Sequence, residues 1–475
     1  MRIFLVWVEE INECADLISG LKQSGHEIVY WLSTKKNQGK LPGTIVHDHY
    51  DAWLGISPPE LATEEFDPPS EELIKKLFSV ESIIMTMMNK HFEGMCVDER
   101  KNYYYNLLGY WYGVLNKFKP EAIIFPAPPH PTFLYLIFEL ARLLKIKTLI
   151  FEHIIDIGRM LWYNNIWQGN QTLLGELAAN RDKKFTVKDL SEDLQLYLKH
   201  YADENKDATP EYLKDDLKKN NFKNKIILLI RLALKSVKDF TILKKVFLYL
   251  KKLLINNIQK EYRRFCTLQP DFSKKFIYVP LHLQPEMTTS PMGGVFASQI
   301  LMIKILAAAL PAGWKIYVKE HPVQWMFFGL NYNDYRYPGY YQQIAQIKNV
   351  KLVPIKTNSF SLIKQAQAVA TVTGTAGWEA ILRGKPALVF GHAWYNDCAG
   401  VFKVDSVESC RSALEKIANG YRLDDQAVMN YLKCFELASI RGLVDKWTGI
   451  NVKLTKREGL TNILSVINNE LKKIT

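Results

Sequence analysis

Residues 369–394 read VATVTGTAGWEAILRGKPALVFGHAW, and this stretch decides the fold of the chain. Together with Ala368, its first residues form a short apolar, partly β-branched run, which predicts a buried strand. Five small residues follow at 373–377, and WEAILR then predicts a helix that ends at Gly384. Pro386 opens a second buried strand, PALVF. A strand, turn, helix and strand in this order form one unit of an α/β fold with a parallel sheet.

The small-residue turn before this helix is a candidate anion site. Unpaired N–H groups and the helix dipole favour a phosphate at a helix N-terminus, and Gly374 and Gly377 have no side chain to keep it away. Thr373 and Thr375 add hydroxyl donors. Glu379 is placed to accept hydrogen bonds from a ribose diol. The alternative is a tight strand-to-helix corner in which the small residues serve packing alone.

Length and composition describe a globular protein of more than one domain. At 475 residues the chain exceeds what one core supports, so we expect two domains of about 200 residues each. Hydrophobic residues make up 48% and charged residues 23%, and no run reaches the ~18 apolar residues that span a bilayer. The six cysteines are scattered without a CxxC pair, which indicates reduced thiols in a cytoplasmic protein and no structural zinc. The opening MRIFLVWVEE is too short and too acidic for a signal peptide.

The net charge of +12 predicts an acidic partner, and much of the positive charge lies in one segment. Residues 222–264 are rich in lysine and lack the residues that break helices, so we expect a basic amphipathic helix. Such a helix suits an anionic membrane surface, and the alternative is a solvated linker helix packed on the domains. Few aromatic residues and no nucleic-acid motif accompany it, so we expect no nucleic-acid partner. The lysines of its polar face are Lys244, Lys245, Lys251 and Lys252.

The pattern on either side of this segment predicts two Rossmann-like domains. Residues 1–200 open with a βαβ unit, although no GxGxxG follows the first strand, and residues 271–475 repeat the alternation of strands and helices. We expect a basic helical linker over 201–270, and we place the terminal helices in the second domain. Tandem domains of this kind face each other across a cleft.

Polar residues at the carboxyl ends of the first domain's strands are candidates for chemistry, because ligands meet an open parallel sheet at that edge. Each of them alone would be an ordinary polar loop residue. Together they form the concentration of side chains in residues 1–200 that can donate or accept a proton. They are Glu9, Glu10, His130, Glu152, His153, Asp156 and Arg159.

Three segments of the second domain follow strands of one sheet and together suit a nucleotide. They are Gln284–Pro285–Glu286 with the loop TTSPMGG, Lys319–Glu320–His321–Pro322, and the turn 373–379. Phosphate binding needs N–H groups, hydroxyls and a cation or proton donor, and ribose needs a carboxylate. These segments supply all of them without a cluster of aspartates to hold a metal. We therefore predict that Gln284, Glu286 and Lys319 bind substrate alongside the turn.

The segment from about 276 to 391 resembles the capsular polysaccharide biosynthesis family, which includes β-Kdo transferases. The resemblance is carried by YVPLHLQPE, VKEHP and TVTGTAGWEAILRGKPALVFG, and bacterial sialyltransferases share a looser similarity. It implies a two-domain glycosyltransferase of the GT-B type that takes a 2-keto sugar acid from CMP, without a metal or further cofactor. The acceptor would be a capsule or lipopolysaccharide at the inner face of the membrane. His321 and the turn 373–375 would hold the phosphate of the departing CMP, and Glu379 would hold its ribose.

Related β-Kdo transferases carry a catalytic acid in a glutamate–aspartate–glycine motif of the first domain. Here the corresponding segment, 152–159, reads EHIIDIGR, and no adjacent pair of acids precedes its glycine. Asp156 comes two residues before Gly158 and matches the motif best, and Glu152 is the alternative. Direct attack of the carboxylate on the sugar gives retention of configuration, whereas deprotonation of an acceptor hydroxyl gives inversion.

Two other hypotheses fit the same plan. A nucleotide-sugar epimerase or a polyol-phosphate polymerase also has tandem Rossmann-like domains, and the base of its preferred nucleotide separates it from a CMP-sugar transferase. A non-catalytic protein that binds a nucleotide sugar or scaffolds polysaccharide assembly is consistent with the departure from the acidic motif. Hydrolysis of the sugar donor without an acceptor distinguishes an enzyme from such a scaffold.

Overall fold

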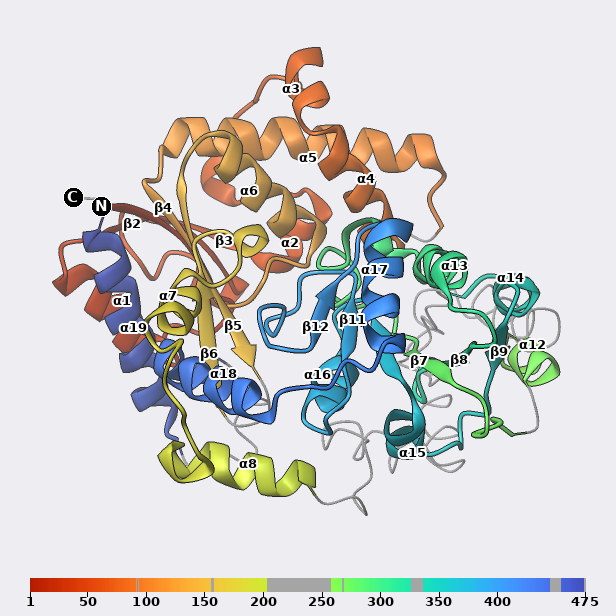
Figure 1. The fold of residues 1–475 in the computed structure, drawn as a ribbon. Coiled ribbons are helices and arrows are strands. Elements are labelled where there is room, and N and C mark those ends of the chain that lie inside the picture. The colour runs from red at the N-terminus through yellow and green to blue at the C-terminus, as the bar shows by residue number, and fades with distance from the viewer. Residues whose placement is uncertain are drawn as a thin grey trace, which may run out of the picture. The chain divides into compact units, whose positions relative to one another are not determined.

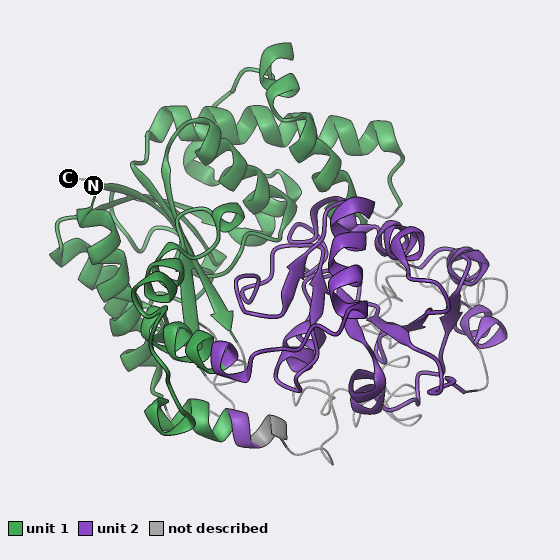
Figure 2. Cartoon of the chain, in the orientation of Figure 1, with its two compact units in different colours: residues 1–197, 429–475 green, residues 198–428 purple. Residues whose placement is uncertain are grey.

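The computed structural model describes residues 1–90, 92, 94–154, 158–202, 258–266, 269–325, 336–444 and 454–473. They form two compact units (Figure 2), and each unit contains one sheet. The first unit is Met1–Tyr197 with Met429–Thr475, and the second is Leu198–Val428. The expected α/β class with two Rossmann-like domains is confirmed, because the first strand of each sheet lies in its middle and later strands are added on both sides.

The sheet of the first unit has the order β13-β6-β5-β4-β1-β2-β3 (Figure 1). The strands from β5 to β3 in this order are parallel, β6 pairs antiparallel with β5, and β13 pairs antiparallel with β6. Runs such as AIIF in β4 are apolar throughout, as a strand covered on both faces requires. The strands are β1 (Arg2–Val6), β2 (Glu27–Ser33), β3 (Ile45–Asp48), β4 (Ala122–Phe125), β5 (Lys147–Ile154), β6 (Arg159–Tyr163) and β13 (Ile440–Arg441).

Helices cover both faces of this sheet. On one face α1 and α19 lie side by side, and a Cβ on Gly20 of α1 would lie 2.1 Å from Leu464 Cδ2 of α19. On the other face Phe4 of β1 meets Trp111 of α5. The helices are α1 (Ala15–Gln23), α2 (His49–Leu54), α3 (Glu71–Lys76), α4 (Phe78–Met87), α5 (Val97–Phe118), α6 (Thr132–Leu143), α7 (Gln171–Ala179), α8 (Glu192–Ala202), α18 (Asp425–Ala438) and α19 (Lys456–Lys472).

The sequence analysis placed the terminal helices in the second domain, and this is correct for α17 (Val407–Ala418) but wrong for α19 and most of α18, which belong to the first unit. β13 pairs with β6, and Ile463 and Ile467 of α19 are fully buried in the core that covers β1. An amphipathic pattern indicates that a helix buries one face, but it does not indicate which sheet that face covers. The sequence therefore does not predict that the chain returns to the first unit at α19. The first unit is therefore discontinuous in sequence, and its boundaries fall inside α8 and α18 instead of at 200 and 271.

The sheet of the second unit is parallel, with the order β12-β11-β10-β7-β8-β9. The strand, turn, helix and strand expected over 368–390 are confirmed as β10, α16 and β11. The strands are β7 (Phe276–Pro280), β8 (Lys315–Lys319), β9 (Val350–Leu352), β10 (Ala368–Thr371), β11 (Ala387–Val389) and β12 (Val401–Lys403). The helices are α12 (Ile258–Phe265), α13 (Gln299–Ala309), α14 (Tyr340–Gln346), α15 (Ser359–Gln365), α16 (Thr375–Ile381) and α17 (Val407–Ala418).

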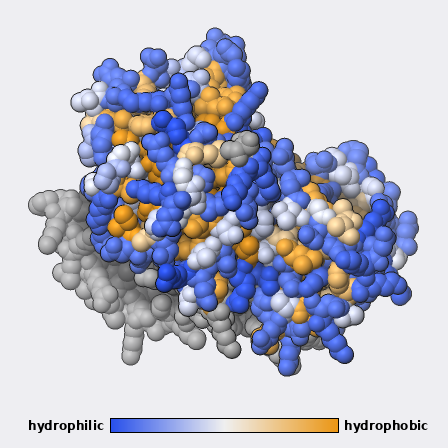
Figure 3. All heavy atoms as spheres, turned by 90° about the vertical axis from the view of Figure 1, so that its left-hand side faces the viewer, coloured by the Kyte–Doolittle hydropathy of each residue, from blue (hydrophilic) through white to orange (hydrophobic). Residues whose placement is uncertain are grey.

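Residues 203–257 lie outside the described residues, and with them most of the basic segment 222–264 and the four lysines of the expected membrane-facing surface. Among the helices that are described, none is both long enough and apolar enough to cross a membrane. On the face drawn in Figure 3, hydrophilic side chains predominate and apolar side chains show between them.

Candidate functional site

Three loops meet at the carboxyl edge of the second unit's sheet. They follow β7, β8 and β10, which are neighbours in the order β10-β7-β8. Hydrogen bonds join the loop after β7 to both of the others. The strand order reverses between β7 and β10, and open α/β sheets bind their ligands at such a switch point. The three segments that the sequence analysis grouped are therefore brought together.

His282 connects the loop after β7 with the turn after β10. Its Nε2 accepts hydrogen bonds from the backbone N–H groups of Val372 at 3.2 Å and of Thr373 at 3.4 Å. The same nitrogen lies 2.9 Å from Thr371 Oγ1, which accepts from Gly374 N at 3.1 Å. Burial lowers the pKa of His282 to about 3, so the ring is neutral and its Nε2 can act as the acceptor. The N–H groups at the start of the turn are therefore bonded to protein.

Close packing accounts for the glycines of this turn. A Cβ on Gly374 would lie 3.0 Å from His282 Cε1, and a Cβ on Gly377 would lie 2.5 Å from the Tyr395 hydroxyl. These neighbours require glycine at both positions whether or not a phosphate binds. Thr375 is exposed at the start of α16, and a phosphate contact there stays a prediction.

The loop TTSPMGG is tied to the same turn. Thr373 Oγ1 donates to the carbonyl of Thr288 at 2.6 Å, so this hydroxyl faces a ligand as an acceptor while that bond is made. Gly293 lies against Val372, where a Cβ would be 2.6 Å from Val372 Cγ1. The carbonyl of Glu286 accepts two backbone N–H groups of the loop, both at 3.0 Å. The Glu286 side chain is half-buried there, and its contact with substrate stays a prediction.

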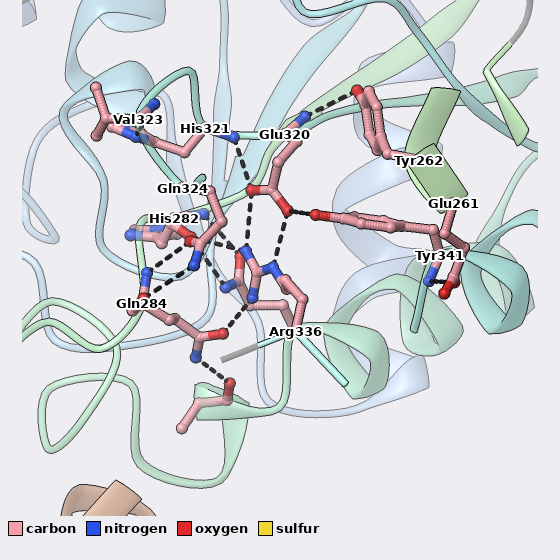
Figure 4. A network of polar contacts seen from close by, with 12 residues as sticks. Glu261, Tyr262, His282, Gln284, Glu320, His321, Val323, Gln324, Arg336 and Tyr341 are labelled. Carbon is pink, nitrogen blue, oxygen red and sulfur yellow. Dashed lines mark hydrogen bonds and ion pairs between the residues drawn. The ribbon is translucent and has the colours of Figure 1, made fainter. Parts of the chain in front are cut away.

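A buried polar network connects the loops after β7 and β8 (Figure 4). Its centre is the ion pair between Glu320 and Arg336, in which Arg336 Nε and Nη2 lie 2.8 and 3.0 Å from the two carboxylate oxygens. Arg336 also donates to the side-chain oxygen of Gln284 and, at 2.9 Å, to the carbonyl of His282. Gln284 Nε2 donates to Ala297 O at 2.9 Å. The structure therefore engages both polar atoms of the Gln284 side chain in protein contacts.

His321 follows Glu320 and is neutral near pH 7. Its backbone N–H donates to Glu320 Oε1 at 2.7 Å, and its ring Nδ1 accepts from Val323 N at 3.4 Å. Burial lowers its pKa to about 4, with Glu320 opposing the shift and Arg336 and Lys319 adding to it. A neutral ring with Nδ1 as the acceptor carries its proton on Nε2. His321 therefore offers one N–H donor and no positive charge.

Lys319 is directed toward the start of α15. Its ammonium donates to Thr357 O at 2.6 Å and to Ser359 Oγ at 2.8 Å, and the residue is buried. The cation that the sequence analysis assigned to the phosphate thus already has protein partners, and its contact with substrate stays a prediction.

Glu379 is buried in α16. Burial raises the pKa of its carboxyl to about 7, and the Arg383 guanidinium opposes this rise. Near pH 7 the carboxyl therefore exists in both protonation states, so it can accept or donate a hydrogen bond. A ribose diol offers both kinds of partner, and the ribose contact stays a prediction.

In the first unit, the structure places one of the two candidate acids. Glu152 lies on β5 and is partly buried, and burial raises its pKa to about 7 while a hydrogen bond with Tyr163 opposes the rise. Asp156 lies outside the described residues. Arg159 donates from Nε and Nη2 to the two carboxylate oxygens of Asp193, at 2.6 and 3.1 Å. The remaining donors of its guanidinium bond Ser191, Ser439 and the carbonyl of Glu436, so all of its nitrogens already have protein partners.

Sequence reasoning missed three members of the second unit's site: His282, Arg336 and Tyr341. His282 lies within YVPLHLQPE, but a single histidine in an apolar run gives no separate signal. Arg336 follows Glu320 by 16 residues, and no helical or strand spacing relates the two. Tyr341 lies in α14, and its hydroxyl donates to Glu320 Oε2 at 2.5 Å. The tyrosine-rich sequence around it predicts only a core position.

Comparison with known proteins matches residues 233–429 to the family described as capsule polysaccharide biosynthesis protein. Among curated proteins, the capsule polysaccharide modification protein LipA of Neisseria meningitidis serogroup B is 42% identical over 57 residues. That match covers 12% of this chain and 8% of the relative.

The similar solved structures are remote. The β-Kdo 2,7 transferase KpsC of Thermosulfurimonas dismutans is 14% identical, with a TM-score of 0.31, over 74% of this chain and 88% of that chain. The UDP-GlcNAc 2-epimerase of Methanocaldococcus jannaschii is 12% identical, with a TM-score of 0.26, over 92% of this chain and 99% of that chain. At these TM-scores neither likeness extends to function or to the roles of residues.

Proposed function

We propose, from the match of residues 233–429 to the capsule polysaccharide biosynthesis family, that this chain is a glycosyltransferase of capsule or lipopolysaccharide synthesis. Its donor would be a 2-keto sugar acid, such as Kdo or a sialic-acid-like nonulosonate, activated by CMP. Its acceptor would be a polysaccharide or glycolipid. The observation that carries the proposal is the meeting of His282, His321 and the turn 373–377 at the switch point of the second sheet.

Transfer breaks the bond between the anomeric carbon of the sugar and the phosphate oxygen of CMP. The bonding electrons leave with CMP, so negative charge grows on the phosphate while the sugar ring becomes positive. His321 Nε2–H would donate a hydrogen bond to this phosphate, and such a bond strengthens as the charge grows. Because the charge on the phosphate is larger after the bond breaks, this donor would stabilise the departing phosphate more than the bound CMP-sugar.

The other contacts of CMP would come from α16 and the loops around it. The exposed Thr375 at the start of α16 would donate its hydroxyl to the phosphate. Glu379 would bond the ribose from within the same helix. Glu286 and Lys319 would line the donor at the ends of β7 and β8. In this proposal the phosphate is held by protein donors alone, so the reaction needs no metal and no further cofactor.

The acid of the first unit would act on the sugar. In one form, the Asp156 carboxylate attacks the anomeric carbon as CMP leaves, and the acceptor hydroxyl then displaces the carboxylate with net retention. In the other form, the carboxylate takes the proton of the acceptor hydroxyl while that oxygen attacks, with inversion. Glu152, whose pKa is raised to about 7, would be the alternative base.

The basic segment 222–264 would bring this chemistry to the acceptor. A helix rich in lysine on one face and in leucine on the other binds anionic lipid headgroups. The proposal therefore places the enzyme at the cytoplasmic face of the membrane, as a peripheral protein.

Nucleotide choice tests the function. Thermal unfolding is measured with CMP, CDP, UDP and UDP-GlcNAc, each with and without EDTA, and release of CMP from CMP-Kdo and from a CMP-sialic acid is then followed. We expect CMP to raise the unfolding temperature most, EDTA to change nothing, and a CMP-sugar to be hydrolysed slowly without acceptor. Stabilisation by UDP-GlcNAc alone would indicate an epimerase, and dependence on CDP-polyols a polyol-phosphate polymerase. Binding of CMP-sugars without any turnover would indicate a scaffold.

A further inference from the structure

The ion pair between Glu320 and Arg336 is buried, and a gain in stability alone does not explain why two charged side chains occupy this position. Both side chains are at most 1% exposed, with Glu320 between β8 and His321. Removing two charges from water is costly, and apolar side chains of the same size often stabilise a core equally well or better. Unlike apolar side chains, a buried ion pair fixes the geometry of its surroundings, because it is stable only when its hydrogen bonds are satisfied.

The guanidinium of Arg336 reaches both loops that carry the histidines. Its Nε and Nη2 bond the carboxylate of Glu320, Nη1 bonds the Gln284 side chain, and Nη2 also bonds the His282 carbonyl. A planar fork with donors at fixed angles can join these three acceptors, whereas the single ammonium of a lysine cannot. The Tyr340 ring lies 4.7 Å from the guanidinium carbon and supports the cation on one side.

The carboxylate of Glu320 continues the chain of contacts to His321 (Figure 4). Its Oε1 accepts from the His321 N–H at 2.7 Å, and its Oε2 accepts from the Tyr341 hydroxyl at 2.5 Å. One end of the network therefore fixes the backbone of His321. The other end fixes the backbone of His282, whose ring holds the turn after β10.

We infer that Glu320 and Arg336 are positioning residues that hold His321 and His282 in the arrangement which transfer requires. The inference rests on the proposed function, since His321 is there the partner of the departing phosphate. The network touches the histidines through their backbones, so the pair acts through them and not on the substrate.

The test compares Glu320→Gln, Arg336→Gln and the double variant with the wild-type chain, using a CMP-sugar and an acceptor. A shift of about 1 Å in a catalytic group lowers the rate by about 100-fold, so we expect kcat of each single variant to fall by about 10- to 100-fold. We expect the KM for the CMP-sugar to change by less than about 3-fold, because the interaction that is lost grows in the transition state. Arg336→Lys keeps the charge without the fork and is expected to behave as Arg336→Gln does in kcat.

The double variant separates positioning from charge balance. Each single variant leaves one buried charge without its partner, whereas the double variant leaves none. We expect its unfolding temperature to recover relative to both single variants while its kcat stays at least 10-fold low. A kcat that recovers together with the unfolding temperature would overturn the inference. Glu470→Gln is the control in the first unit: it neutralises a buried carboxylate that pairs with the partly buried Lys147 at 3.8 Å and with Lys473 at 2.6 Å, and it should lower stability without lowering kcat.

Two further measurements cover the remaining outcomes. If the charge variants fail to fold, Tyr341→Phe removes one hydrogen bond from Glu320 and keeps the ring, and we expect kcat to fall by about 3- to 10-fold. An unchanged kcat would refute the positioning role. If the wild-type chain transfers no sugar, the proposed function fails by itself. Backbone amide exchange at His321 and Thr373 then decides the inference, since both should exchange faster in Arg336→Gln, and equal rates would contradict it.

Discussion

Replacing His282 tests whether its ring holds the turn after β10. The ring accepts the N–H groups of Val372 and Thr373 and lies against the hydroxyl of Thr371. His282→Leu has a similar volume and no acceptor. His282→Gln is the matched variant, because its side-chain oxygen can reach the position of Nε2 and accept the same N–H groups.

The expected cost follows from these contacts. A buried donor that loses its acceptor costs about 1–3 kcal/mol. The two N–H groups share one nitrogen at 3.2 and 3.4 Å, so neither bond is at its full strength. We therefore expect His282→Leu to lower the free energy of opening of the turn by about 2–4 kcal/mol, and His282→Gln to lower it by less than about 1 kcal/mol.

Amide hydrogen exchange measures this quantity where it acts. A loss of about 2–4 kcal/mol corresponds to exchange on the order of 30- to 1000-fold faster at Val372, Thr373 and Gly374. The amides of β7 serve as the internal reference, because they belong to the core of the same sheet. If these three amides exchange at the same rate in His282→Leu as in the wild type, the ring does not hold the turn.

Further predictions concern pH, packing, the first unit's acid and the membrane. The folded pKa of His282 is about 3, below the unfolded value, so its stabilising contribution is complete above about pH 6.5 and falls as the pH drops. From pH 7 to pH 5 the free energy of unfolding of the wild type should fall by about 2 kcal/mol relative to that of His282→Gln in chemical denaturation, so that the variant becomes the more stable of the two, and a constant difference would contradict this. Gly377→Ala should destabilise the second unit by about 1–3 kcal/mol, because the added Cβ would lie 2.5 Å from the Tyr395 hydroxyl. Adding Tyr395→Phe to this variant should recover part of the lost stability, and stability losses that simply add in the double variant would argue against the contact. Asp156→Ala should abolish transfer and keep CMP binding; near-normal turnover with a dead Glu152→Ala would move the role to Glu152, and activity in both would end the first-unit mechanism. A variant in which four lysines of the basic segment are changed to glutamine should be released from anionic vesicles and should keep its activity on a soluble acceptor. Those lysines are Lys244, Lys245, Lys251 and Lys252. Unchanged co-sedimentation with the vesicles would support a linker helix.

The fold could be predicted wherever local patterns carry the information. Buried parallel strands are short apolar runs, and β10, α16 and β11 appear where the sequence expects them. The return of α19 to the first unit could not be predicted. It depends on the match between Gly20 and Leu464, two positions far apart in sequence, and neither residue is unusual where it stands.

The candidate site divides in the same way. The sequence identifies the three segments that meet, because each follows a strand of one sheet. It does not identify what each side chain contacts, since that depends on partners from other segments. Lys319 is an example: the sequence offers a cation beside the phosphate site, and the structure shows its ammonium bonded to Thr357 and Ser359.

A small-residue turn has the same sequence whether it faces a phosphate or a buried ring. Here the ring is that of His282, 90 residues before Val372, and it takes the N–H groups at the start of the turn. A phosphate at this edge would therefore find its donors further along, at Thr375 and at the Nε2–H of His321. In the proposed function these two groups, which carry no net charge, would donate hydrogen bonds to the single phosphate of CMP. The neutral state of both histidines is thus part of the proposed specificity, because a protonated His282 could no longer accept the N–H groups that shape the turn.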